Sequence, residues 1–126
     1  MSTTAFVLEP DPAERKWIES ALTAMVGAVI FVDDPASLLA LLPAGEGDCL
    51  IACTEPDAAV VLDLVRELRR RGAKLPAVVI GPHTAFRTAV EIARLEATDF
   101  LERPFSERQL RGAVRRVCRE ADKAQR

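Results

Sequence analysis

Two kinds of hydrophobic pattern alternate along almost the whole chain. Short runs typical of strands lie at residues 5–8, 28–32, 49–53, 77–80 and 98–101. Between them, apolar residues recur every three or four positions, which is the period of an amphipathic helix. The runs at 28–32, 49–53 and 77–80 are apolar throughout, and we expect them to be parallel strands covered by helices on both faces. The pattern therefore predicts five strands that alternate with five helices.

Helix-start signals support this order. Asp11-Pro12 and Asp34-Pro35 each place a capping carboxylate before a proline at the first helical position. Ser106 with Gln109 forms a capping sequence for the last helix, and the remaining helices are expected at about 57–71 and 85–95. The second helix is expected to end at Pro43, Gly45 and Gly47.

The predicted elements define a fold class. The residues expected to face the core are Trp17, Ile18, Ala21, Leu22, Met25, Leu38, Leu39, Leu41, Leu42, Val61, Leu64, Val65, Leu68, Leu110, Ala113, Val114, Val117 and Cys118. Right-handed crossovers then give an α/β fold of (βα)5 order, a doubly wound parallel five-stranded sheet. In such sheets the functional site lies beyond the carboxyl ends of the strands.

Composition narrows the functional classes. A chain of 126 residues has the size of one domain, and no apolar run approaches the roughly 20 residues that cross a bilayer. A net charge of -2 argues against sequence-independent binding of nucleic acid, so DNA contact would need a separate domain. Cys49, Cys53 and Cys118 form neither a C-x-x-C pair nor a zinc pattern. We expect a cytoplasmic protein with reduced thiols that binds neither membrane nor nucleic acid directly.

Four loops at the carboxyl ends of strands hold the candidate chemistry. They are Glu9-Pro10-Asp11, Cys53-Thr54-Glu55, Gly81-Pro82-His83 and Glu102-Arg103-Pro104-Phe105. Over residues 5–120 the spacing resembles the receiver domain of two-component response regulators. The segment at 99–105 resembles the one that ends in Lys-Pro-Phe in receivers of the nitrogen-fixation regulator subfamily. The resemblance implies a flavodoxin-like receiver fold for residues 1–122, with 123–126 as a charged tail that starts a linker.

The resemblance also implies a phosphorylation pocket in which almost every position is changed. A working receiver has an acidic pair after the first strand, an acceptor Asp ending the third, Thr or Ser ending the fourth and Lys after the fifth. The corresponding residues here are Glu9 and Pro10 with the neighbouring Asp11, then Cys53, Gly81 and Arg103, and the switch aromatic position holds Phe100. The peptide between Arg103 and Pro104 is expected to be cis, as the matching bond usually is in the family.

These changes predict a pocket with weak or absent magnesium binding and no other cofactor. Mg²⁺ requires hard oxygen ligands, and Pro10 and Cys53 remove two of the three carboxylates that the family supplies. Glu9 and Asp11 remain as weak candidate ligands. Glu55 lies near enough in sequence to reach the pocket, although a loop position does not fix its direction. A thiol at position 53 cannot form an aspartyl phosphate, and no other nucleophile–base pair is visible, so we expect no enzymatic activity.

Our first hypothesis is a degenerate receiver, or pseudo-receiver, that signals through protein contacts. Its expected partners are a sensor kinase, an output domain or another regulator. Arg108, Arg111 and Arg115 lie opposite the apolar stripe of the last helix. In receivers the face formed by the fourth helix, fifth strand and fifth helix binds output domains or a second copy. A simply solvated arginine face is the alternative interpretation of the same residues.

Other functions stay open from the sequence. The domain could be the N-terminal input of a DNA-binding transcription regulator, or Cys53 could respond to oxidation or to a small ligand; a small buried thiol is the simpler interpretation of Cys53. We expect the lone His83 to be a solvated loop residue. A flavin-binding protein of similar topology is disfavoured, because Glu9-Pro10-Asp11-Pro12 offers carboxylates and prolines where a phosphate loop needs backbone donors.

Overall fold

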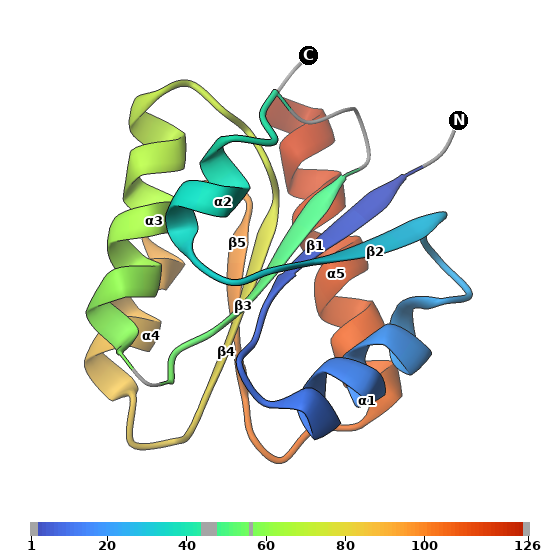
Figure 1. Cartoon of the computed structure of the whole chain (residues 1–126). Coiled ribbons are helices and arrows are strands. Elements are labelled where there is room, and N and C mark those ends of the chain that lie inside the picture. The colour runs from blue at the N-terminus through green and yellow to red at the C-terminus, as the bar shows by residue number, and fades with distance from the viewer. Residues whose placement is uncertain (1–2, 44–47, 56, 125–126) are drawn as a thin grey trace.

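The predicted alternation of strands and helices is confirmed in the computed structural model, which describes residues 3–43, 48–55 and 57–124 (Figure 1). The strands are β1 Thr4–Leu8, β2 Ala28–Val32, β3 Cys49–Cys53, β4 Ala77–Gly81 and β5 Thr98–Glu102. The helices are α1 Pro12–Leu22, α2 Pro35–Leu39, α3 Ala58–Arg70, α4 Phe86–Ala93 and α5 Glu107–Ala124. No helix in these described ranges is long and apolar enough to cross a membrane.

All five strands are parallel and lie in one sheet in the order β2-β1-β3-β4-β5. Helices α1 and α5 cover one face of the sheet, and α2, α3 and α4 cover the other, as Figure 1 shows. The strand order reverses direction between β1 and β3, since the chain builds outward from β1 on one side and from β3 on the other. Such a reversal point is where parallel sheets of this class carry their sites.

The prediction that all three continuous apolar runs are covered on both faces is wrong for β2. Every residue of β3 and β4 is buried, but β2 forms the edge of the sheet and its Ile30 is 39% exposed. The interior position belongs instead to β1, which pairs with both β2 and β3. Apolar composition alone could not show this, because the strand order is set by pairing between distant segments.

The helix-start signals form the hydrogen bonds expected of them. The Asp11 carboxylate accepts from the Ala13 amide at 3.3 Å, and the Asp34 carboxylate caps α2 at 2.7 Å. At the start of α5 the Ser106 hydroxyl accepts from the Gln109 amide while the Gln109 side chain accepts from the Ser106 amide, at 3.1 and 2.8 Å. The sequence-predicted capping residues are therefore confirmed.

Most of the predicted core positions are buried, but not all. Leu41 is exposed because α2 ends at Leu39 and the chain leaves the helix before it. The half-buried positions are Trp17, Met25, Leu39, Leu42 and Cys118. Residues 45 and 47, expected to close this helix, lie outside the described residues. The two core clusters fix the sheet between its helix layers, which holds the carboxyl ends of β1, β3, β4 and β5 at one edge.

Candidate functional site

Four of the predicted pocket residues meet at the carboxyl edge of the sheet. Glu9 follows β1, Cys53 ends β3, Gly81 ends β4 and Arg103 follows β5. They converge because β1, β3, β4 and β5 are consecutive neighbours in the sheet. The expected cis peptide between Arg103 and Pro104 is present.

Arg103 is at the centre of the site. Its Nη1 atom lies 2.6 Å from each carboxylate oxygen of Glu55, and its Nη2 atom lies 3.0 Å from the Cys53 sulfur. Nη2 is also 3.6 Å from Glu9 Oε2, and Nε is 3.8 Å from Glu14 Oε1. Partial burial works against the charge, but the contacts with Cys53 and Glu55 outweigh it and the pKa of the Arg103 guanidinium is raised. The group is therefore a fixed cation.

Glu9 is the deepest carboxylate of the site, with a side chain only 3% exposed. Its Oε1 atom accepts a hydrogen bond from the Asp11 amide at 3.0 Å. Its Oε2 atom is buried and has no hydrogen-bond partner among the described residues, so the compensating charge nearest to it is Arg103. The Asp11 carboxylate caps α1 and the Pro10 side chain is exposed, so of these three neighbours only Glu9 projects a carboxylate into the interior.

Cys53 is 3% exposed and acts as a neutral thiol. Its sulfur accepts from Arg103 and donates to Glu55 Oε2 at 3.6 Å. Burial raises the pKa of the Cys53 thiol to about 11, against the opposing influence of Arg103. A thiol with this pKa carries almost no thiolate at neutral pH, which favours its interpretation as a small buried side chain over that of a reactive sensor.

Gly81 has no space for a side chain. A Cβ atom at this position would lie 2.7 Å from the Thr54 hydroxyl and 2.9 Å from Cζ of Phe100. The place beside the end of β4 is therefore filled by Thr54, which is 4% exposed, and by the half-buried Phe100 ring. In this chain a hydroxyl comes from β3 and not from β4.

Two residues of the site have no role in the sequence-based prediction: Thr54, which is named only as part of a candidate loop, and Glu14. Thr54 follows the acceptor position directly, and its amide donates to the Ile80 carbonyl at 2.9 Å, which turns it toward β4. Glu14 lies in the first turn of α1 and faces Arg103. A search for carboxylates one helical turn beyond the first loop would have found Glu14. The inward direction of Glu55 is now also established by its contact with Arg103.

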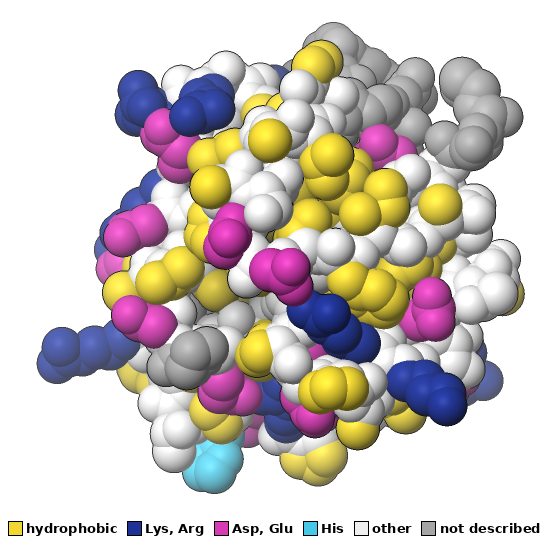
Figure 2. Space-filling view, viewed as in Figure 1, with side chains coloured by type: hydrophobic (Ala, Val, Ile, Leu, Met, Phe, Trp, Pro, Cys, Tyr) yellow, Lys and Arg dark blue, Asp and Glu magenta, His cyan; other side chains and the backbone are white. Residues whose placement is uncertain are grey.

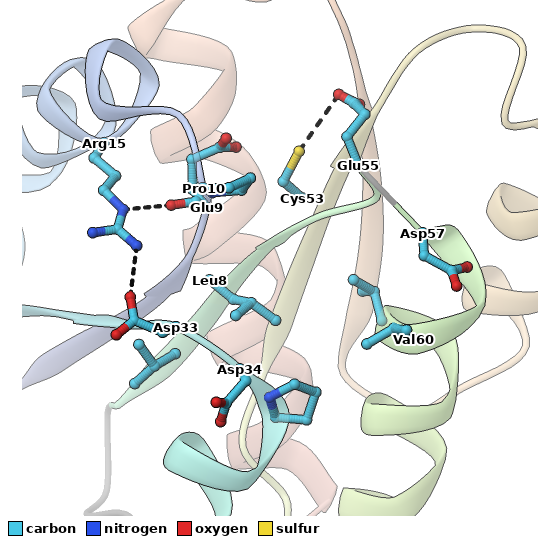
Figure 3. A pocket seen from close by; sticks show the side chains of 13 residues that line it. Leu8, Glu9, Pro10, Arg15, Asp33, Asp34, Cys53, Glu55, Asp57 and Val60 are labelled. Atoms are coloured by element: carbon cyan, nitrogen blue, oxygen red, sulfur yellow. Dashed lines mark hydrogen bonds and ion pairs between the residues drawn. The ribbon is translucent and has the colours of Figure 1, made fainter.

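A groove of about 410 Å³ adjoins the site between the ends of β1, β2 and β3 and the starts of α2 and α3 (Figure 3). Its walls include the apolar side chains of Leu8, Val32 and Val61. Figure 2 shows hydrophobic side chains gathered over the middle and right of this face, with acidic and basic side chains intermingled along their lower border. Arg15 and Asp33, which also line the groove, pair at 3.2 Å (Figure 3).

Magnesium, the ion that the family resemblance implies, does not fit the residues present. No group of three or more His, Cys, Asp or Glu side chains in the described parts of the chain is arranged to hold a metal ion. The Arg103 guanidinium lies between Glu9, Glu55 and Cys53, where an ion would need to approach. Hard oxygen ligands in octahedral geometry are required by Mg²⁺, and a thiol beside a fixed cation does not supply them.

The remaining predicted residues lie away from the pocket. Arg108 and Arg115 are exposed on α5, whereas Arg111 donates to the Ala21 carbonyl of α1 at 3.2 Å and pairs with Glu107 at 3.3 Å. Arg111 therefore faces α1. His83 is exposed in the loop after β4, as expected.

Comparison with solved structures identifies the class of this fold. The crystal structure of full-length FixJ from B. japonicum matches with a TM-score of 0.82 and 24% sequence identity, over 97% of this chain and 60% of that chain. Five parallel strands alternating with five helices in this arrangement form the flavodoxin-like fold of receiver domains. No family model matches the sequence.

Sequence relatives give the family. Transcriptional regulatory protein FixJ of Azorhizobium caulinodans is 32% identical over 117 residues, which are 90% of this chain and 54% of the relative. Response regulator protein TodT of Pseudomonas putida is 25% identical over 114 residues, which are 90% of this chain and 50% of the relative. The chain belongs to the response-regulator receiver domains of two-component signalling. It spans about half the length of these curated relatives.

Proposed function

We propose that this domain is a pseudo-receiver, a regulatory and non-enzymatic module that signals by protein contacts and forms no acyl phosphate. The observation that carries the proposal is Cys53, a buried thiol at the end of β3 where the family places its acceptor carboxylate. Phosphoryl transfer to a receiver needs an oxygen nucleophile with a metal ion that neutralises the incoming charge. Neither requirement is met by a protonated thiol beside a guanidinium.

The other groups of the site do not replace the missing acceptor. Both oxygens of Glu55 accept from Arg103 at 2.6 Å, so its lone pairs are engaged by a fixed cation. Glu9 is only 3% exposed, and its Oε2 atom faces the Arg103 guanidinium at 3.6 Å, so this carboxylate is also engaged by the fixed cation. At the end of β4, Gly81 supplies no hydroxyl to bind a phosphoryl oxygen. Groups that act as a unit in catalysis are not replaced one at a time, so the combined loss is decisive.

In a domain that is not phosphorylated, signalling depends on surface residues whose arrangement does not change with phosphorylation. Phe86 is 72% exposed on α4, Val90 is exposed one turn later, and Arg108 and Arg115 are exposed on α5. Exposed aromatic side chains and exposed arginines are both enriched among the anchor residues of protein interfaces. We propose that the face formed by α4, β5 and α5 binds a sensor kinase, an output domain, another regulator or a second copy of the chain in the cytoplasm.

The names of the relatives suggest one setting for this face. FixJ is a transcriptional regulatory protein, and the chain spans about half of it. The domain would then act as the input part of a DNA-binding regulator. Of the predicted tail, residues 123–124 still belong to α5, and 125–126 lie outside the described residues. The interpretation predicts that Phe86→Ala weakens self-association or partner binding without loss of fold, measured by sedimentation equilibrium and circular dichroism.

The phosphorylation claim is tested by intact mass. The purified domain is incubated with Mg²⁺ and acetyl phosphate beside a receiver known to accept phosphate. We expect an adduct on the competent receiver and none on this domain. A stoichiometric phosphoryl adduct on this domain would refute the pseudo-receiver proposal, and its location at Glu55, Glu9 or Asp11 would identify an unexpected acceptor.

A further inference from the structure

One side chain joins three segments at the carboxyl edge of the sheet. Arg103 comes from the loop after β5, Glu55 from the loop after β3, and Glu9 and Glu14 from the end of β1 and the first turn of α1. The Nη1 atom of Arg103 contacts both carboxylate oxygens of Glu55 at 2.6 Å. The contacts of Arg103 with Glu9 and Glu14 are ion pairs at 3.6 and 3.8 Å. Three acidic groups from two segments therefore share a single cation that comes from a third.

The buried position of Glu9 makes this cation necessary. An ionised carboxylate that is removed from water must be compensated by hydrogen bonds or by an opposite charge. Glu9 Oε1 has the Asp11 amide, but Glu9 Oε2 has no hydrogen bond within the described residues and faces Arg103. Without Arg103, the three carboxylates would lose the cation that contacts all of them. The Arg15 guanidinium lies nearby, but it donates to the Glu9 backbone carbonyl and pairs with Asp33.

We infer that Arg103 is the resident cation of this edge, standing where receivers bind a divalent metal ion, and that it holds the three segments together without metal or phosphate. This inference rests on the proposed function and adds to it the reason why the three segments keep one arrangement without metal or phosphate. An arginine suits the role because its planar fork reaches two acceptors at once and stays charged at every physiological pH. A dication placed among the same carboxylates would be repelled by the guanidinium a few ångströms away.

The inference is tested by thermal unfolding of the intact chain in EDTA, in MgCl₂ and in CaCl₂, with no phosphate donor present. Ca²⁺ is included because it tolerates irregular oxygen coordination that Mg²⁺ does not. The variants are Arg103→Gln, the double variant Arg103→Gln with Glu9→Gln, and Arg116→Gln as a control. Arg116 pairs with Asp99 on the surface. Arg116→Gln therefore removes one arginine charge, as Arg103→Gln does, but at a place away from the site.

We expect the wild-type Tm to be the same in all three solutions. Arg103→Gln should lower the Tm by about 10 °C in EDTA, since it leaves a buried carboxylate without its partner. Adding Glu9→Gln should recover at least half of that loss, because the uncompensated charge is then gone. Divalent ions should raise the Tm of Arg103→Gln by a few degrees, with Ca²⁺ the stronger, and should leave the double variant and the Arg116→Gln control unchanged.

Two results would overturn the inference. One is a rise in wild-type Tm with Mg²⁺ or Ca²⁺, which would show that a metal binds beside Arg103. The other is an Arg103→Gln variant whose Tm neither falls more than that of Arg116→Gln nor recovers with Glu9→Gln. If Arg103→Gln is unfolded in EDTA, circular dichroism is used to ask whether the fold returns when Ca²⁺ is added to this variant or when Glu9→Gln is combined with it. A chain that stays unfolded in both cases also overturns the inference. Because no phosphoryl donor is present, these outcomes are independent of the adduct test of the proposed function.

Discussion

The Thr54 hydroxyl lies 2.7 Å from the point where a Cβ atom would stand on Gly81. Thr54 belongs to the segment after β3 and Gly81 ends β4, so the two residues are neighbours across the strand pair. This contact places a hydroxyl beside the pocket while excluding a side chain from the end of β4. The contact explains why a glycine suits position 81, because the Thr54 hydroxyl occupies the space that a side chain there would need.

The first prediction concerns Gly81→Ser, which restores the residue type that receivers carry at this position. Its Cβ would stand within 3.0 Å of Thr54 and Phe100, closer than side-chain atoms pack. Overpacking of this kind lowers the free energy of unfolding by about 1–3 kcal/mol. Urea unfolding followed by circular dichroism measures the change.

The matched control for Gly81→Ser is the same substitution combined with Thr54→Ala. Removing the Thr54 hydroxyl and methyl opens the space for the new side chain, so part of the lost stability should return. A double variant that is less stable than the sum of the two single variants would contradict the packing account of Gly81.

The second prediction concerns the order in which the cysteines react. The Cys49 thiol donates a hydrogen bond that lowers the pKa of Cys118, and Cys118 is only half-buried. Burial raises the pKa of Cys53 to about 11, which implies about a hundred-fold less thiolate than an ordinary thiol has at neutral pH. Iodoacetamide should therefore modify Cys118 first in the native protein, as measured by peptide mass mapping.

The same experiment decides between the two interpretations of Cys53. Equal modification of all three cysteines after unfolding is the control for reagent access. If Cys53 in the native protein reacts as fast as Cys118, the buried-thiol account is wrong and the redox or ligand-responsive hypothesis regains support.

The third prediction concerns stability at alkaline pH. The pKa of Cys53 is raised from 9.0 to about 11 in the folded state, so folding favours the protonated thiol. Its contribution is complete below pH 9 and is lost as the pH rises to 11, when the folded protein must ionise a buried thiol. A shift of this size corresponds to about 3 kcal/mol.

The measurement is the free energy of unfolding of wild type and Cys53→Ala between pH 8 and about pH 11. The free energy of unfolding of the wild type should fall relative to that of Cys53→Ala over this range, because the other titrating groups affect both proteins equally. A difference that stays constant with pH would show that the Cys53 thiol is not buried as described.

Much of the site follows from the sequence because parallel strands end at a common edge. Once the runs at 5–8, 49–53 and 77–80 are recognised as strands, Glu9, Cys53 and Gly81 are expected at the same edge of the sheet. That they are neighbours there follows from the strand order β1-β3-β4, which the structure supplies. The direction of Glu55 was not predictable, since it follows the strand in a loop and is fixed by its contact with Arg103. The exposed edge position of β2 likewise depends on its pairing with β1, which the apolar pattern of β2 does not encode.

The pocket's independence from phosphate and metal is tested most directly by amide NMR spectra in Mg²⁺ with beryllofluoride, a mimic of the phosphoryl group on a carboxylate. Our account predicts that the amide shifts of Cys53, Gly81 and Arg103 are the same with and without the two additives, while a competent receiver under identical conditions shows large changes. Saturable shifts confined to these three positions and their neighbours would contradict the account, because they would show that the site still assembles around a phosphoryl group.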